Sequence, residues 1–213
     1  MTIKRLTTAH PYFSEDTIKR GLAFLVLIDE EEIPYTFSII NHHEAKVLVL
    51  DERFVDEVIE VFLDYSGHIS KIVDQFQTVR FLREKVPIYF VPIEALSMSQ
   101  FYISKDKLET ISSWAKNQDD FILQVMATEN ELILADGHTR LKLAKQRNFT
   151  HVYVYKQRHD PLLMAFHKEA LKRKIKTIDD VSIIEKDAYE EKWHRFCNKF
   201  IKSYEKMLKG GLK

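Results

Sequence analysis

Glycine is the residue that most limits how this chain can fold, because it occurs only five times in 213 residues. Between Gly67 and Gly210 the sequence contains one glycine, Gly137. It follows the apolar run 132–135 and precedes the helix-like segment 141–144. A chain that uses glycine so rarely places it where the backbone must turn sharply or approach another group closely. The sequence therefore predicts a strand, a tight turn at Gly137 and a helix, in that order.

The residues of this turn carry most of the groups that a phosphate site needs. Backbone N–H groups at the start of a helix attract anions. Arg140 adds a bidentate phosphate donor, Thr139 a hydroxyl and His138 a ring that titrates near neutrality. Asp136 is expected at the C-terminal end of the strand, where ligands of α/β units commonly bind. The alternative is that Asp136 or Thr139 only caps the helix and that Gly137 is only a turn residue.

The segment from Val91 to Tyr155 resembles the ParB/sulfiredoxin superfamily. The resemblance rests on a first strand and its exit at 91–96, a helix with Leu108, Ile111 and Trp114, a strand at 121–126, the strand and turn 131–140, and a closing strand at 151–155. The Asp-Gly-His-Thr-Arg form of the turn looks most like the branch that contains kinases of free serine.

The resemblance implies a nucleotide site at the turn. The residues that would hold the phosphates are Gly137, His138, Thr139 and Arg140. Asp136 would be the catalytic base or the carboxylate that binds the metal, with His138 and Arg140 also catalytic. The implied cofactors are a nucleoside di- or triphosphate, ATP or ADP first, and magnesium.

One position departs from the kinase-like pattern. Those members carry a His-Glu pair just after the first strand, which supplies a second catalytic carboxylate. This chain has Ser-Met-Ser-Gln at 97–100, so Glu94 is the nearest substitute.

The sequence leaves two functions open, besides a vestigial fold that serves only as a scaffold, which the intact motif at 136–140 disfavours. One is an enzyme that transfers the terminal phosphoryl group of a nucleotide to a small hydroxyl-bearing substrate, or hydrolyses it. The other is a nucleotide-gated module that binds DNA or a protein and is related to ParB partition proteins. The equal numbers of acidic and basic residues, 32 each, disfavour the DNA version. The excess of basic residues from Arg158 onward is interleaved with acids, which is typical of a solvated helical face.

The predicted fold class is α+β, in three parts. Residues 1–86 form a small α+β domain of unknown family, with a hairpin of runs 21–28 and 35–40, a further strand at 46–50 and a helix at 53–65. Residues 87–157 form the ParB/sulfiredoxin-like domain with a mixed sheet. Residues 158–213 form a helical extension that packs on the central domain.

The extension is predicted to contain a helix that opens at Pro161, a shorter helix capped at 177–180, and a last helix at 186–208. The last helix has an apolar stripe, formed by Tyr189, Trp193, Phe196, Phe200 and Ile201. This stripe is either core or, through Trp193 or Tyr189, part of a lid over the nucleotide site.

The cysteine content and the hydropathy of the chain indicate its cellular location. The only cysteine is Cys197, so neither an intramolecular disulfide nor a cysteine-based zinc site is expected. No apolar run reaches the ~18 to 20 residues that a membrane span requires. We therefore expect a cytoplasmic protein without a membrane partner.

Overall fold

The structure is a computed structural model that describes residues 1–210. It is an α+β fold with mixed sheets and a C-terminal helix, as the sequence predicts. The chain divides into two compact units, Met1–Ile88 and a second unit that begins at Tyr89. The sequence instead predicts three parts, which end at residues 86, 157 and 213. The segment from 158 onward belongs to the same unit as the central segment.

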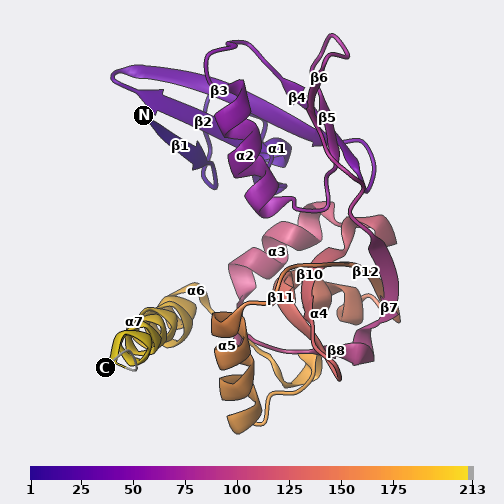
Figure 1. Cartoon of the computed structure of the whole chain (residues 1–213), viewed down its shortest axis with the longest axis vertical. Coiled ribbons are helices and arrows are strands. Elements are labelled where there is room, and N and C mark those ends of the chain that lie inside the picture. The colour runs from indigo at the N-terminus through magenta and orange to yellow at the C-terminus, as the bar shows by residue number, and fades with distance from the viewer. Residues whose placement is uncertain (211–213) are drawn as a thin grey trace. The chain divides into compact units, whose positions relative to one another are not determined.

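The N-terminal unit is built on a six-stranded sheet in the order β1-β2-β3-β4-β5-β6 (Figure 1). The strands are β1 (Thr2–Arg5), β2 (Ala23–Ile28), β3 (Glu31–Ile39), β4 (Glu44–Leu48), β5 (Lys71–Val73) and β6 (Val79–Leu82). Neighbouring strands are antiparallel except β4 and β5, which are parallel. The helices are α1 (Glu15–Lys19) and α2 (Val55–Tyr65).

The core of this unit follows from alternation along the strands. Ile33, Tyr35 and Phe37 of β3 point to one face of the sheet and are buried there. The apolar face of α2 covers them, and the rings of Phe37 and Phe62 stack with centroids 4.0 Å apart. The predicted helix at 53–65 is thereby confirmed as α2.

The predicted hairpin is also confirmed, but its connection is shorter than expected. β3 begins at Glu31, so only Asp29 and Glu30 join it to β2, and Asp29 adopts a left-handed φ of 52°. Pro34, expected in the connection, lies inside β3 opposite Leu25. Proline is rare inside strands because it has no N–H to donate, so it is a poor signal for a strand there.

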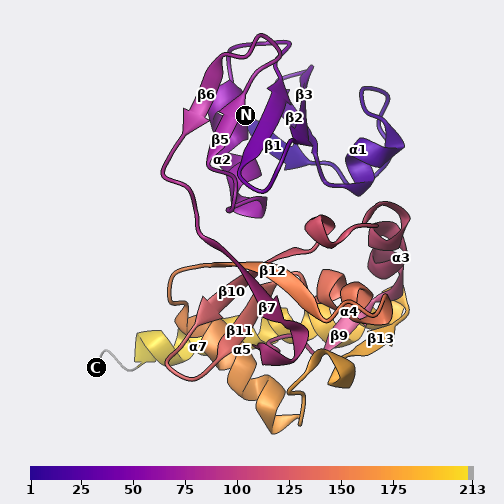
Figure 2. The ribbon, with the colours of Figure 1, turned by 90° about the vertical axis from the view of Figure 1, so that its right-hand side faces the viewer.

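The second unit contains a five-stranded sheet in the order β7-β12-β10-β11-β8, of which Figure 2 labels β7, β10, β11 and β12. Its strands are β7 (Ile88–Pro92), β8 (Leu96–Ser97), β10 (Ile122–Ala127), β11 (Leu132–Asp136) and β12 (His151–Lys156). β10 is antiparallel to β11 and parallel to β12, and β8 is parallel to β11. A separate parallel pair joins β9 (Tyr102–Ser104) and β13 (Ser182–Ile184).

Helices cover both faces of this sheet. Helices α3 (Lys105–Trp114) and α4 (His138–Gln146) cover one face and α5 (Pro161–Lys172) covers the other. The unit also contains α6 (Lys186–Tyr189), α7 (Arg195–Gly210) and the short 3-10 turns η1 (Ile93–Ala95), η2 (Gln118–Asp120) and η3 (Ile178–Asp180). Leu123 and Leu134 face the core that α3 and α4 close. Met126 and Ile133 face α5. Alternation along β10 and β11 therefore gives the sheet two apolar faces, one packed against α3 and α4 and the other against α5.

The C-terminal segments differ from the prediction in two places. The predicted helix after 177–180 is only the 3-10 turn η3, and β13 follows it. The predicted last helix is interrupted, because a π-helical turn, η4 (Glu190–His194), separates α6 from α7. Trp193 packs edge-on against Phe101 with centroids 5.0 Å apart, and Phe200 lies 4.7 Å from Phe166. The apolar stripe thus packs against the rest of this unit.

Candidate functional site

The turn at residues 136–140 joins β11 to α4, in the strand-turn-helix order that the sequence predicts. Gly137 adopts a left-handed conformation with φ 100° and ψ 18°. A Cβ on this residue would lie 2.6 Å from Cδ2 of Leu123, which is closer than van der Waals contact allows. The backbone angle therefore favours glycine, and any larger residue would also have to displace the Leu123 side chain.

The start of α4 has no side-chain cap at its N-cap residue. Gly137 occupies the N-cap position, and it has no side chain that could accept a hydrogen bond from the first turn. Its carbonyl accepts from the N–H of Leu141 at 2.8 Å. The N–H groups of residues 138–140 come before that first intrahelical bond, where a helix has no partners of its own for them.

Arg140 folds back over the turn. Its Nη1 donates to the carbonyl of Ile122 at 2.7 Å, and its Nη2 lies 2.8 Å from Oδ2 of Asp136. The Arg140 side chain is 23% exposed and that of Asp136 is 67% exposed. The structure therefore places a positioned guanidinium and a solvent-facing carboxylate next to the helix start.

His138 is directed into the protein. It is 4% exposed, and its Nε2 accepts from the backbone N–H of Ser99 at 3.3 Å. The Ser99 hydroxyl donates to the Leu134 carbonyl at 2.7 Å. Burial lowers the pKa of His138 to about 4, so the ring is neutral near pH 7. The backbone N–H of His138 can still contribute to an anion site.

Ser99 is the residue at this site that the sequence analysis does not identify. It belongs to the segment 97–100, where the kinase-like pattern would have a carboxylate. The structure joins that segment to the turn through the Ser99 contact with His138. No short motif reveals such a contact, because the two residues lie 39 positions apart in the sequence.

Glu94 lies away from the turn. Its Oε1 is 2.8 Å from Nζ of Lys145, in the last turn of α4, and this hydrogen bond lowers the pKa of Glu94. Lys145 follows His138, the first residue of α4, by seven residues, which corresponds to about 10 Å along the helix axis. The structure therefore brings Asp136, Gly137, His138, Thr139 and Arg140 together and leaves Glu94 at the opposite end of the helix.

Asp136 is the carboxylate that the turn itself supplies, and it is paired with Arg140. Within residues 1–210, no group of three or more His, Cys, Asp or Glu side chains could hold a metal ion. Magnesium often binds through one or two carboxylates together with substrate phosphates. Asp136 offers one such carboxylate.

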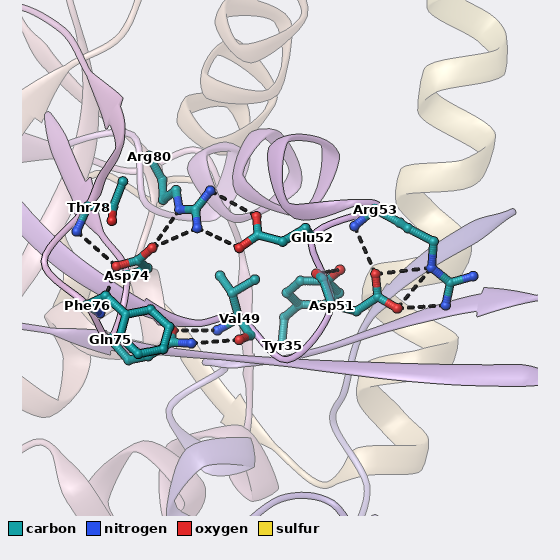
Figure 3. Close-up of polar contacts among 10 residues, drawn as sticks. All are labelled: Tyr35, Val49, Asp51, Glu52, Arg53, Asp74, Gln75, Phe76, Thr78 and Arg80. Atoms are coloured by element: carbon teal, nitrogen blue, oxygen red, sulfur yellow. Dashed lines mark hydrogen bonds and ion pairs between the residues drawn. The ribbon is translucent and has the colours of Figure 1, made fainter.

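The N-terminal unit contains a second dense polar cluster, which Figure 3 shows. Asp74 is completely buried and accepts hydrogen bonds from the N–H groups of Phe76 and Thr78 and from Arg80. Burial raises the pKa of Asp74, but these hydrogen bonds outweigh it and hold the pKa below its usual value. Arg80 also forms a bidentate pair with Glu52, at 2.6 and 2.9 Å.

The same cluster connects the β5–β6 turn to the segment after β4. The Gln75 side chain donates to the Val49 carbonyl at 2.7 Å and accepts from the Val49 N–H at 3.0 Å. The Tyr35 hydroxyl donates to the Asp51 carbonyl at 2.7 Å, and burial raises the Tyr35 pKa to about 12. Because its central groups bond to one another and to backbone, this cluster stabilises the unit and offers no ready ligand site.

Comparisons with known proteins add little. No protein-family model matches the sequence, and no curated protein matches it. The chain is similar to the crystal structure of protein Atu1540 from Agrobacterium tumefaciens, with 17% sequence identity and a TM-score of 0.34 over 46% of this chain. The match covers 63% of that protein, less than two thirds of its length. A TM-score this low supports no inference about fold or function, so the ParB/sulfiredoxin resemblance stays a prediction.

Among residues 1–210, no helix has the length and apolar character needed to cross a bilayer.

Proposed function

We propose that the turn at 136–140 binds the phosphates of a nucleoside di- or triphosphate, ATP or ADP first. In this proposal the protein is a ParB/sulfiredoxin-like phosphotransferase or nucleotide hydrolase of the cytoplasm. The observation that carries the proposal is the left-handed Gly137 at the N-cap of α4, with the Arg140 guanidinium folded against it. Helix starts with free N–H groups and a nearby arginine are suited to phosphate.

Each residue of the turn has a distinct role in this proposal. The N–H groups of His138, Thr139 and Arg140 hold phosphate oxygens. The Arg140 side chain neutralises charge, and its bond to the Ile122 carbonyl limits the freedom that it would lose on binding. Asp136 activates the hydroxyl of a small substrate or holds magnesium, which would neutralise phosphate charge when bound. The buried His138 ring positions the turn and does not transfer protons.

The first test is a thermal-shift screen with ATP, ADP, CTP and GTP in the presence of magnesium. A ligand at 100 times its Kd stabilises the folded state by about 2.7 kcal/mol. We expect one nucleotide to raise the Tm of the wild type and of Lys145→Ala, which alters the far end of α4, but not of Arg140→Ala. The shift is measured against each variant's own Tm without nucleotide. A wild type that responds to none of the four contradicts the proposal.

Catalysis requires a separate test. With the responding nucleotide, Asp136→Asn should retain the thermal shift and lose phosphate release or transfer, because the amide cannot act as a base. Unchanged turnover in Asp136→Asn contradicts the catalytic role of Asp136.

A second function is favoured by the position of Glu94. Its ion pair with Lys145 leaves Asp136 without a second carboxylate from that segment, which suits binding better than turnover. In this alternative the nucleotide switches association with DNA or a protein. Nucleotide binding without turnover, together with a gel shift of duplex DNA that weakens steeply as salt rises, would support it.

A further inference from the structure

A groove of about 680 Å³ lies between α5 and α7, apart from the turn at 136–140. Its lining residues recur at three and four positions on each helix, so one face of α5 and one face of α7 form its two walls. The two helices are held together by the aromatic contact between Phe166 and Phe200. The groove therefore follows from how these helices pack.

The floor of the groove is apolar. It is formed by Met164, Ala165, Phe200, Tyr204 and Met207. Met207 is 62% exposed. Methionine is common at surfaces that receive a partner helix, because its flexible side chain adapts to the shape of the partner.

The charge around this floor is positive. Lys168 and Lys172 lie on the α5 wall, and the one acidic lining residue, Glu169, is 3.5 Å from Lys172 and 3.1 Å from Arg173. On α7, Lys199 and Lys206 lie four residues before and three residues after the lining residue Ser203, so they neighbour it on the helix surface. A molecule in this groove would meet an apolar floor with cationic edges.

We propose that this groove binds an acidic amphipathic helix of a partner protein. Two antiparallel or crossing helices with an apolar furrow between them provide the helix-in-groove mode of recognition. The α5 wall from Pro161 to Lys172 is about 17 Å long, which matches about three helical turns. A partner with leucines on one face and glutamates on the other complements both the floor and the edges.

The same observations disfavour two other occupants. A second copy of α7 would bring lysines against lysines, which is repulsive. A lipid bilayer offers a flat surface, whereas the apolar side chains here line a concave furrow. The charge and the shape together select a helix with acidic flanks.

The test uses the full chain and a synthetic 20-residue helix with leucines at i, i+3, i+4 and i+7 and glutamates elsewhere. Binding is measured by fluorescence anisotropy of the labelled peptide. A second peptide carries lysine in place of every glutamate. The groove variants are Lys168→Glu with Lys172→Glu, and Met207→Asp. Met207 is exposed, so its replacement does not endanger folding. The matched control is Lys202→Glu, an exposed position on the opposite side of α7.

We expect micromolar binding of the acidic peptide, weakened about tenfold by each groove variant and less than about twofold by Lys202→Glu. The lysine peptide should not bind. Failure of the acidic peptide to bind, or equal weakening by Lys202→Glu, overturns the proposal. Loss of self-association in sedimentation on Met207→Asp would indicate a second copy of the chain as the occupant, and loss of binding to phosphatidylserine vesicles would indicate a membrane. Either result, without binding of the acidic peptide, also overturns the proposal.

Discussion

Gly137 is constrained by its backbone angle and by its neighbour, and the two constraints can be measured separately. We predict that Gly137→Ala lowers the free energy of unfolding by about 1–3 kcal/mol, because alanine is strained at this left-handed φ and its Cβ meets Leu123. Urea denaturation measures the loss. In a double-mutant cycle with Leu123→Val, part of it should be recovered, since valine lacks the Cδ2 atom that causes the clash. Purely additive effects would contradict the steric part of the explanation.

His138 should make stability depend on pH. Its folded-state pKa of about 4 lies below the ordinary histidine value of 6.5, so the unfolded state binds a proton first as the pH falls. Its contribution is therefore intact above pH 6.5 and declines between pH 6.5 and 4, by about 3 kcal/mol in total.

Matched glutamine variants isolate this effect. His138→Gln should be less stable at pH 7 but should show a flatter decline of unfolding free energy towards pH 4. His159→Gln, at an exposed position, should follow the wild-type curve. A wild-type slope in His138→Gln would show that another group causes the decline.

The residues of the turn also show what a sequence can and cannot reveal. The scarcity of glycine was sufficient to predict a constrained turn at Gly137, because backbone requirements are local. The direction of the His138 ring was not predictable, since it depends on Ser99, which belongs to a distant segment. The distance of Glu94 from the turn was not predictable either, because Glu94 pairs with Lys145, which lies in the last turn of α4.

At the scale of elements, α5 is anchored to the sheet by a buried histidine. His167 is 2% exposed, and its nitrogens lie 2.9 Å from the Met98 carbonyl and 3.0 Å from Oε2 of Glu131. We predict that His167→Phe destabilises the protein by about 1–3 kcal/mol, because it removes both partners of these oxygens and leaves the Met98 carbonyl without its hydrogen bond. Glu131→Gln, which keeps an acceptor, should cost less in the same urea titration. Equal losses would contradict this account.

The β5–β6 turn has a corresponding anchor in Asp74. Asp74→Ala should lower the urea midpoint of the N-terminal unit, because the N–H groups of Phe76 and Thr78 and the Arg80 side chain lose their acceptor. Asp74→Asn keeps an acceptor and should lower the midpoint less. Because the pKa of Asp74 is depressed, the stabilisation that it gives is lost only as the pH falls below the usual range of aspartate. Equal midpoints for the two variants would contradict the role of the hydrogen bonds.

Long or strongly patterned elements were predictable from sequence and short ones were not. The helix α2 and the hairpin of β2 and β3 follow from periodicity in apolar residues. β5 and β13 have three residues each, too few to show a period. They form because they pair with strands elsewhere in the chain, which a local pattern does not encode.

At the scale of the whole molecule, the residues of the candidate site all lie in the second unit, which has its own core. We predict that a fragment of residues 89–213 folds and retains any nucleotide-dependent, Arg140-dependent rise in Tm that the full chain shows. Circular dichroism checks folding, and the thermal-shift assay checks the response. A folded fragment that does not respond, beside a full chain that does, would contradict the assignment of the site to this unit.

The π-helical turn between α6 and α7 determines which single-residue deletions the packing of α7 tolerates. A π turn contains one more residue than an α turn, and each residue of an α-helix advances the helical phase by about 100°. Loss of a single residue here, for example Lys192, would therefore convert the π turn into an α turn and leave the phase of the following helix unchanged. Phe196 and Phe200 would then keep their contacts with Phe101 and Phe166, whereas loss of one residue from the regular helix α7, for example Lys199, would turn Phe200 away from Phe166.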